Sequence, residues 1–224
     1  MRVLLVTGGP YHPFDTTAPT LASLLRDEGI EPVVSGDVDG ALRSLAEFDL
    51  LALYLLRWRM RGAMFDADRD RWAGSLSDEG REAILDHLGR GRGVLAMHTA
   101  AVCFDDWPEW ADILGAVWDW ERSSHPPPRP SPIHVVGPHP IVDGLDDFEV
   151  VDEIYSFLDD RGVTPLLTSP RRGVEQPVLW AHSAGGGRVV YDALGHDDRS
   201  LAHPIHATVI RRAARWALGG DVRR

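Results

Sequence analysis

A histidine stands at the end of an apolar run near the middle of the chain, in a setting typical of active-site turns. The run Val94–Met97 predicts a buried strand, and His98 follows it directly. Ala96 and Ala100 lie two positions before and two positions after this histidine, where a tight strand-to-helix turn requires small side chains. Such a turn presents its tip residue at the carboxyl end of a sheet, beside the positive end of the next helix. An ordinary turn with a locally bonded histidine fits the segment equally well.

A second histidine follows another strand-like segment much later in the chain. Arg188–Leu194 predicts a strand, and Gly195 and His196 come after it. The glycine permits an unusual backbone angle or the close approach of a ligand. Asp198, two residues beyond the histidine, could orient the imidazole ring by fixing its tautomer. The alternative is a polar loop that happens to contain a histidine. That interpretation is less favoured because two predicted strands, which could belong to one sheet, both end in a histidine.

Paired carboxylates, Asp152 and Glu153, lie between two apolar runs. Strand alternation places them on opposite faces, so at least one is expected to be partly enclosed. Taken alone, the segment fits an exposed turn between two strands better. If Glu153 meets His98 and His196 at one edge of a sheet, the three side chains could transfer protons or hold a divalent metal such as zinc with an open coordination position.

The remaining candidate side chains have weaker cases. His12 lies in the loop after the first predicted strand, on the side of the sheet where ligands bind. His125 and His139 each precede proline, a setting common in structural loops. Cys103, the only cysteine, is predicted to be a small buried hydrophobe. The other histidines are expected on the surface or in the core: His87, His134, His182, His203 and His206.

Tryptophan is abundant, with eight residues in the chain. Aromatic planes near a site can stack on sugar rings, but core packing or a subunit interface accounts for most of them more simply. A protein-interaction surface or a homo-oligomer interface in the stretch 107–120 stays open. Four tryptophans lie in that stretch: Trp107, Trp110, Trp118 and Trp120.

The candidate site residues can meet only if a sheet brings them together, and the first half of the sequence predicts a parallel sheet. Short apolar runs alternate there with segments of helical spacing, an order typical of parallel strands with helices on both faces. Ligands bind such sheets at the carboxyl ends of the strands. The predicted strands are Val3–Val6, Pro32–Ser35, Leu50–Leu56 and Val94–Met97. The predicted helices run from about Leu21 to Gly29, around Leu42–Ala46, and from the N-cap Ser77 to His87 with Ile84, Leu85 and Leu88 on the inner face.

The second half of the chain has a different pattern. The proline-rich stretch Pro126–Pro132 predicts a loop or an extended segment. A last helix is expected from about Pro204 to Leu218, ended by Gly219 and Gly220. We expect one domain over residues 1–224, whose second half adds mixed or antiparallel strands. The strand-like pieces are Ile133–Val136, Phe148–Val151, Val163–Leu167, Val178–Trp180 and Arg188–Leu194.

Composition excludes several classes of protein. The net charge is −11 and all 23 basic residues are arginine, so the chain should repel phosphate backbones and nucleic-acid binding is not expected. With 44% apolar and 25% charged residues, the composition is that of a globular protein. No apolar stretch approaches the roughly 20 residues of a membrane helix, and the single cysteine cannot form an internal disulfide. The cytoplasm is the simplest location.

Taken in order, these segments resemble the ThuA-like (trehalose utilisation) family, whose fold is similar to that of class I glutamine amidotransferases. The resemblance covers nearly the whole chain and implies a three-layer α/β sandwich, with a mainly parallel, flavodoxin-like sheet flanked by helices. The matching segments are the loop with His12, Ala96–Ala100, Ser124–Pro126, His139–Ile141, Asp152–Tyr155, Gly187–Tyr191 and Gly195–Asp197.

The comparison with true amidotransferases separates fold from activity. Those enzymes carry a cysteine nucleophile at the elbow and a His-x-Glu sequence after a later strand. Here the elbow holds His98, and His196, Asp197 and Asp198 resemble the second element with aspartate in place of glutamate. Because imidazole replaces a thiolate poorly in acyl transfer, glutamine hydrolysis is not expected.

The family name implies a role in disaccharide or oxidised-sugar metabolism. We therefore expect an enzyme acting on a disaccharide or a keto sugar, as a hydrolase, a lyase or an isomerase. The expected catalytic residues are His98, His196, Glu153 and Asp198, and the first three are the candidate ligands of a divalent metal. No nucleotide cofactor is expected.

Three further residues are expected to contact the small-molecule sugar substrate: His12, Tyr155 and His125. A non-catalytic sugar-binding or regulatory protein that keeps the pocket is the alternative function. Neither nucleic acid nor a membrane is an expected partner, and a homo-oligomer stays open.

Overall fold

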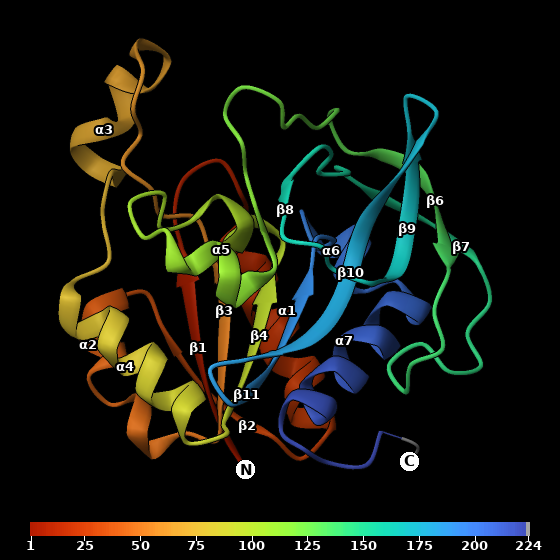
Figure 1. Ribbon diagram of the computed structural model, residues 1–224, viewed down its shortest axis with the longest axis horizontal. Helices are drawn as coiled ribbons and strands as arrows, with labels where there is room; N and C mark the ends of the chain where they lie inside the picture. The colour runs from red at the N-terminus through yellow and green to blue at the C-terminus, as the bar shows by residue number, and fades with distance from the viewer. Residues whose placement is uncertain (223–224) are drawn as a thin grey trace.

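One nine-stranded sheet joins the two halves of the chain in the computed structural model, which describes residues 1–222 (Figure 1). Its strand order is β2-β1-β3-β4-β11-β10-β9-β6-β7. The strands of this sheet are β1 (Arg2–Gly8), β2 (Glu31–Ser35), β3 (Leu50–Leu55), β4 (Gly93–Met97), β6 (Arg129–Val135), β7 (Phe148–Asp152), β9 (Pro165–Arg171), β10 (Val174–Ala184) and β11 (Gly187–Asp192). A separate two-stranded sheet pairs β5 (Ala116–Val117) with β8 (Asp159–Asp160).

The first five strands in this order are all parallel. Their order, β2-β1-β3-β4-β11, is the 2-1-3-4-5 order of flavodoxin-like sheets. Every residue of β3 and β4 is buried, as expected for parallel strands that are covered on both faces. This half confirms the parallel sheet that the sequence predicts, and it places the carboxyl ends of β1, β4 and β11 along one edge.

The remaining strands extend the sheet in antiparallel fashion, from β10 through β9 and β6 to β7. This confirms the mixed second half. The end of the proline-rich stretch forms the first part of β6. Pro130 and Pro132 pair with β7 there, whereas only His134 and Val135 of β6 pair with β9. A proline lacks the N–H that a second neighbouring strand would need, so it is tolerated in this part of β6.

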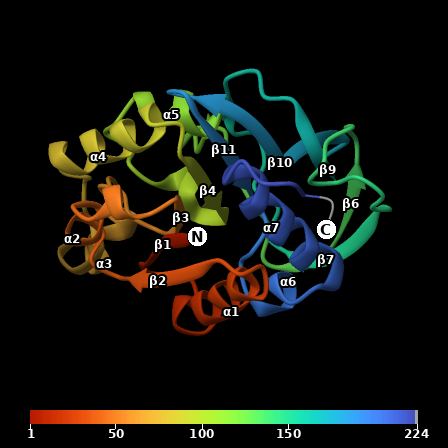
Figure 2. The same cartoon turned by 90° about the horizontal axis from the view of Figure 1, so that it is seen from below.

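Helices cover both faces of the sheet (Figure 2). On one face lie α1 (Phe14–Asp27), α6 (Asp198–Leu201) and α7 (Pro204–Ala217), and on the other lie α2 (Val38–Leu42), α4 (Asp78–Gly89) and α5 (Glu109–Leu114). The helix α3 (Asp66–Trp72) extends beyond the sheet edge in Figure 1, and the short 3-10 helices are η1 (Leu45–Glu47), η2 (Ala63–Phe65) and η3 (His98–Val102). None of the helices within residues 1–222 is both long and apolar enough to cross a bilayer.

The local signals for α4 are mostly confirmed. Ser77 caps the helix, since its side chain accepts a hydrogen bond from the Gly80 N–H at 3.0 Å. Ile84 and Leu88 are fully buried, but the predicted inward position of Leu85 is wrong, because that side chain is 45% exposed. Leu85 lies about 100° further round the helix axis than Ile84, which turns it away from the buried face.

Candidate active site

The predicted elbow at the end of β4 is present and strained. His98 has a backbone φ of +41°, a left-handed conformation that non-glycine residues rarely adopt. Ala96 and Ala100 on either side are fully buried, so larger side chains would not fit. The chain then continues as the 3-10 helix η3. Strained backbone of this kind persists where the surrounding structure enforces it, and such residues cluster at functional sites.

The ring of His98 is buried and fixed in one tautomer. Its Nδ1 lies 2.7 Å from the Ala193 carbonyl oxygen. Because a carbonyl oxygen can only accept, Nδ1 carries the proton and Nε2 keeps a free lone pair. The Tyr191 hydroxyl donates to the His98 carbonyl oxygen at 2.6 Å, which holds the backbone of the elbow as well.

His196 reaches the same place from the loop after β11. Gly195, at a φ of +115°, donates its N–H to Asp152 at 2.6 Å, and the His196 N–H donates to the same carboxylate at 3.2 Å. The Tyr54 hydroxyl donates to the Gly195 carbonyl oxygen at 2.5 Å. The loop is therefore held by buried polar contacts on two sides. Asp152 holds this loop and was not among the residues predicted for the site, although the acidic doublet between apolar runs was its signal.

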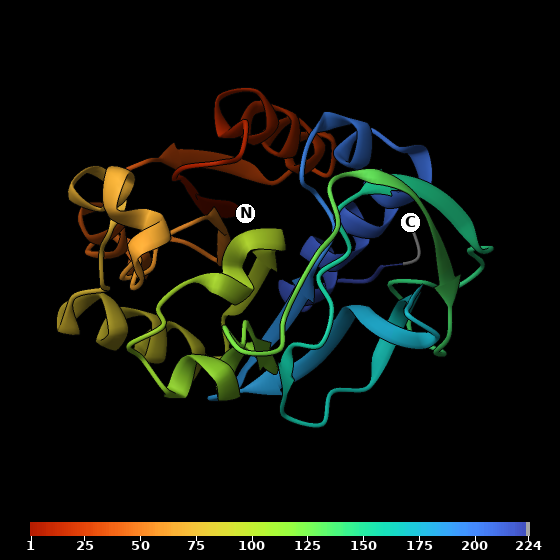
Figure 3. The same ribbon diagram turned by 90° about the horizontal axis from the view of Figure 1, so that it is seen from above.

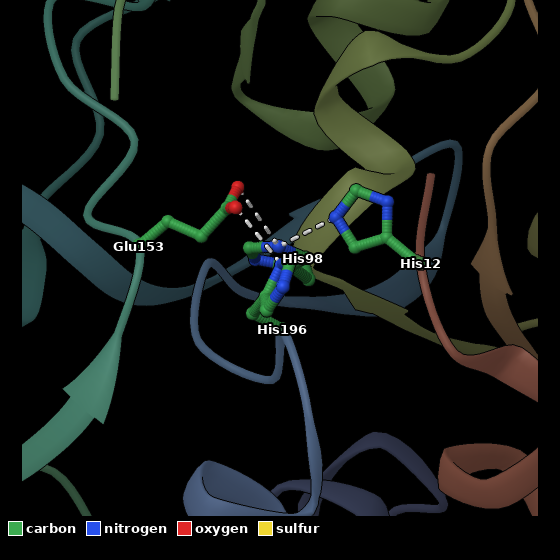
Figure 4. A group of neighbouring side chains, drawn as sticks. All are labelled: His12, His98, Glu153 and His196. Carbon is green, nitrogen blue, oxygen red and sulfur yellow. Dashed lines mark hydrogen bonds and ion pairs between the residues drawn. The ribbon is translucent and has the colours of Figure 1, made fainter. Parts of the chain in front are cut away.

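In Figure 4, Glu153 stands at one side of the group and points its carboxylate toward His98 and His196, with His12 on the opposite side. Its Oε1 is 3.0 Å from His196 Nδ1, and its Oε2 is 3.8 Å from His98 Nε2. Because β7 ends at Asp152, the predicted strand alternation does not extend to Glu153. Both carboxylates are buried, so the exposed turn that this segment alone favoured is wrong. The structure thus brings together the three residues that the sequence suggested as a group.

His12 completes the cluster from the loop after β1. Its Nε2 is 3.2 Å from His98 Nε2, and its ring centroid is 4.7 Å from that of His196. One ligand atom from each of the four side chains lies within 4.8 Å of the others. We call His12, His98, Glu153 and His196 the four-residue cluster. It lies at the carboxyl edge of the parallel strands, onto which Figure 3 looks from above.

The other two predicted substrate contacts border this cluster. The Tyr155 ring lies 4.5 Å from the His98 ring, and the His125 Nδ1 is 3.1 Å from Glu153 Oε2. An isolated antiparallel bridge between Ser124 and Ser156 holds their two segments side by side. Tyr155 is buried, whereas the side chain of His125 is 38% exposed, so His125 stands at the mouth of the site.

Asp198 is placed differently from its predicted role. It begins α6, which Asp197 caps by accepting a hydrogen bond from the Arg199 N–H. No hydrogen bond or ion pair links Asp198 to His196 within residues 1–222. The carboxylate that faces His196 is Glu153 instead. The positive φ at Gly195 and the cap at Asp197 turn the chain into α6, so spacing along the sequence was a poor guide here.

Burial sets the charge state of the imidazoles. It lowers the pKa of His98 and of His12 to about 3, with neighbouring histidines adding to the effect, so both rings are neutral at pH 7. Burial also disfavours a charged His196, but contact with the Glu153 carboxylate outweighs it and raises the pKa of His196. The cluster therefore combines two neutral imidazoles with an imidazole–carboxylate pair that can hold a proton.

The donor set fits a divalent metal ion. Glu153 Oε2 and His196 Nδ1 are buried, and within the described residues their closest polar partners are the ion-pair contacts to His125 Nδ1 and to Glu153 Oε1. Two nitrogen or oxygen ligands of one zinc ion stand roughly 3–4 Å apart. The observed separations are 3.2 Å for His12–His98, 3.8 Å for His98–Glu153 Oε2 and 3.0 Å for His196–Glu153 Oε1, and no pair of the four ligand atoms exceeds 4.8 Å. The hydrogen bond from His98 to Ala193 is of the kind that orients ligating histidines. His12 becomes a fourth candidate ligand that the sequence had assigned to the substrate.

Comparison with known proteins gives a family and a fold. A sequence model described as trehalose utilisation (ThuA) matches residues 2–217. A search of curated proteins found no match. A ThuA-like protein from Parabacteroides merdae ATCC 43184 superposes with a TM-score of 0.80 at 20% identity, over 100% of this chain and 92% of that one.

Two further solved structures share the architecture. A ThuA-like protein from Bacteroides uniformis ATCC 8492 gives a TM-score of 0.73 at 16% identity, over 99% of this chain and 94% of that one. A β-galactosidase from Rahnella sp. R3 gives 0.64 at 13% identity, over 97% of this chain but 31% of that one. At these identities the likeness shows the fold, an α/β arrangement with a large mixed sheet flanked by helices. The relation to glutamine amidotransferases stays a prediction.

Proposed function

Because the chain belongs to the ThuA, or trehalose utilisation, family, we propose that it is an enzyme acting on a disaccharide or an oxidised (keto) sugar. The family name points to a carbohydrate-related role. The observation that carries the proposal is the four-residue cluster, whose ligand atoms lie within 4.8 Å of one another. It stands at the carboxyl ends of parallel strands, where ligands of such sheets bind.

The residues of the cluster divide into two roles. His12 and His98 are neutral and nearly or fully enclosed, so they are suited to bind a metal together with Glu153 and His196. A divalent metal held there would supply a Lewis acid for a carbonyl or hydroxyl oxygen of the sugar. His98 cannot change tautomer without losing its hydrogen bond to Ala193, so its Nε2 stays directed at the cluster.

In the metal-free cluster, Glu153 and His196 supply proton transfer instead of metal ligands. His196 Nδ1 and Glu153 Oε1 are 3.0 Å apart, and contact with the carboxylate raises the pKa of His196 against the effect of burial, so the pair can hold a proton between them. Such a pair can take a proton from a hydroxyl group, or from a carbon next to a carbonyl, and return it elsewhere on the substrate. This chemistry serves a hydrolase, a lyase or an isomerase acting on a sugar.

The only thiol of the chain is poorly placed for glutamine hydrolysis. Cys103 is buried, and its sulfur lies 3.2 Å from the Leu55 carbonyl oxygen. Burial raises the pKa of the thiol to about 12, so it would not be a thiolate at neutral pH. This supports a reaction other than acyl transfer from glutamine.

Turnover of metal-loaded protein tests the proposal. Trehalose and its keto form are offered to the wild type, to His98→Ala, to Glu153→Gln and to the control His134→Ala, whose ring lies on β6, pairs with Glu175 and is not part of the cluster. We expect both cluster variants to lose at least about a hundredfold in kcat/KM while keeping the Tm of the metal-free wild type, and the control to keep both its kcat/KM and its Tm.

Unchanged turnover in both cluster variants would refute the assigned roles. If metal-loaded wild type binds these sugars without converting them, the non-catalytic sugar-binding function replaces the enzyme.

A further inference from the structure

Aromatic rings form a continuous row from the β1 loop to the four-residue cluster. Tyr11 lies 6.3 Å from Trp58, Trp58 lies 6.2 Å from Trp120, and Trp120 lies 6.0 Å from Trp118. Trp118 in turn lies 5.1 Å from Tyr155, whose ring contacts His98. Four segments that are distant in sequence thus place their aromatic side chains along one path that ends at the cluster.

Trp120 presents an open aromatic surface in this row. Its ring stacks on Trp58 with an angle of 22° between the planes, and Phe65 packs edge-on against it. Trp58 is only 2% exposed and backs one face of Trp120, yet Trp120 itself is 49% exposed. A tryptophan fixed from behind and open in front is a rigid apolar plane, which suits the C–H face of a pyranose ring.

A cavity of about 570 Å³ lies against this surface, lined in part by Trp118, Trp120 and Phe65. This volume is within the range of roughly 300–1,000 Å³ that small-molecule sites occupy. Arg59 also lines it and is held in place by Asp105, which accepts from its backbone N–H at 2.9 Å and from its Nε at 3.2 Å. A fixed guanidinium beside aromatic planes offers hydrogen-bond donors to sugar hydroxyl groups.

The cavity and the four-residue cluster are neighbours. His98 begins η3, and Ala101 and Val102 at the other end of the same 3-10 helix line the cavity. The rise of a 3-10 helix separates them by only about 6–8 Å. Trp118 lines the cavity and also contacts Tyr155, so its ring borders both the cavity and the residues beside the cluster.

We propose that Trp118 and Trp120 form a subsite for a second sugar ring, so that the protein takes a two-ring saccharide with one ring at the cluster and the other in this cavity. The proposal rests on the proposed function and deepens it by committing to the size of the substrate. A single-ring sugar would leave the tryptophan surface empty.

Calorimetric titration with glucose and with trehalose tests the subsite. Trp120→Ala should weaken trehalose binding about tenfold and change glucose binding less than about twofold, since only the second ring reaches Trp120. Trp120→Phe should restore most of the lost affinity. Trp216→Ala is the matched control: this partly buried tryptophan packs on Arg188 and His139, away from the cavity, and its removal should leave both affinities unchanged.

Equal losses for the two sugars, or no loss for trehalose, would overturn the subsite. Absence of saturable trehalose binding to the wild type would overturn it as well, while leaving keto-sugar turnover as a separate test of the function. The same titration on metal-free His98→Ala separates the tryptophan subsite from the proposed function of the four-residue cluster, because this variant alters the cluster but keeps Trp118 and Trp120. If the cluster proves to bind no metal and to do no chemistry, a loss of trehalose affinity confined to Trp120→Ala would still support the subsite.

Discussion

Asp152 shows how a single buried side chain prepares the site without facing a substrate. Its carboxylate accepts hydrogen bonds from the backbone N–H groups of Glu153, Gly195 and His196 at 2.8, 2.6 and 3.2 Å. Two of these donors belong to members of the four-residue cluster. Burial raises the pKa of this carboxyl to about 6, which is the cost of placing it under the loop. Asp152 is therefore a positioning residue.

Asp152→Asn should loosen the loop that carries His196. The amide would place N–H groups against backbone donors, so we expect a loss of about 1–3 kcal/mol in the free energy of unfolding and at least tenfold weaker zinc binding. Urea denaturation and a competition titration measure the two. Glu149→Gln on the exposed face of the same strand is the control and should change neither. Wild-type zinc affinity in Asp152→Asn would show that the loop holds without this contact.

Glu153→Gln should change the protonation of His196 in metal-free protein. The charge of Glu153 raises the pKa of that imidazole against the effect of burial, so removing the charge should let burial lower it. An NMR titration of the histidine ring protons should therefore show His196 protonating at a lower pH than in the wild type. The His134 signal serves as the internal reference. An unshifted His196 would mean that Glu153 does not set its charge state.

At the scale of elements, a buried ion pair fastens α7 to β11 beneath the site. His206 Nε2 lies 3.0 Å from an Asp192 carboxylate oxygen, and its Nδ1 lies 2.9 Å from the Ser200 carbonyl oxygen. Both ring nitrogens therefore face acceptors, which favours the imidazolium form. Burial disfavours that charge, but Asp192 outweighs it and raises the pKa of His206.

This pair predicts a pH-dependent contribution to stability. Because the folded-state pKa of His206 lies above the unfolded value of about 6.5, its stabilisation is complete below that pH and is lost as pH rises through the folded value. His206→Asn should cost several kcal/mol at pH 6, since it leaves Asp192 buried and unpaired, and less at pH 9. Urea denaturation at both pH values measures this. A difference that grows with pH would contradict the charged pair.

The sequence predicted the central elements best, because their burial is local information. β3 and β4 are buried on both faces and appear as unbroken apolar runs, and the elbow at His98 is marked by its small neighbours. The strand β10 is longer than the predicted Val178–Trp180, because its outer residues are half-exposed and polar in a hairpin with β11.

The meeting of Glu153 with the histidines could not be read from spacing. β7 lies at the far end of the sheet order, well away from β4 and β11. After Asp152 the chain leaves that strand and returns, so that Ser156 pairs with Ser124 next to the site. This return depends on tertiary packing, and no local pattern announces it. The sequence could therefore suggest the residues of the group but not their distances.

At the scale of the whole molecule, metal binding should be linked to folding. Four ligands from four separate segments converge only in the folded chain, so an ion that binds them stabilises that state. Zinc at about 100 times its Kd adds about 2.7 kcal/mol, or a rise of roughly 5–10 °C in Tm for a protein of this size. Scanning fluorimetry with zinc and then with a chelator measures the shift and its reversal. His98→Ala should show little shift, and an equal shift in that variant would place the ion elsewhere.

Anomalous diffraction at the zinc edge, from crystals grown with one equivalent of zinc, would show directly where the protein holds the ion. We expect one dominant peak enclosed by His12, His98, Glu153 and His196, about 2.0–2.2 Å from their ligand atoms. A map with no peak among these four side chains, while zinc occupies another position, would contradict this expectation.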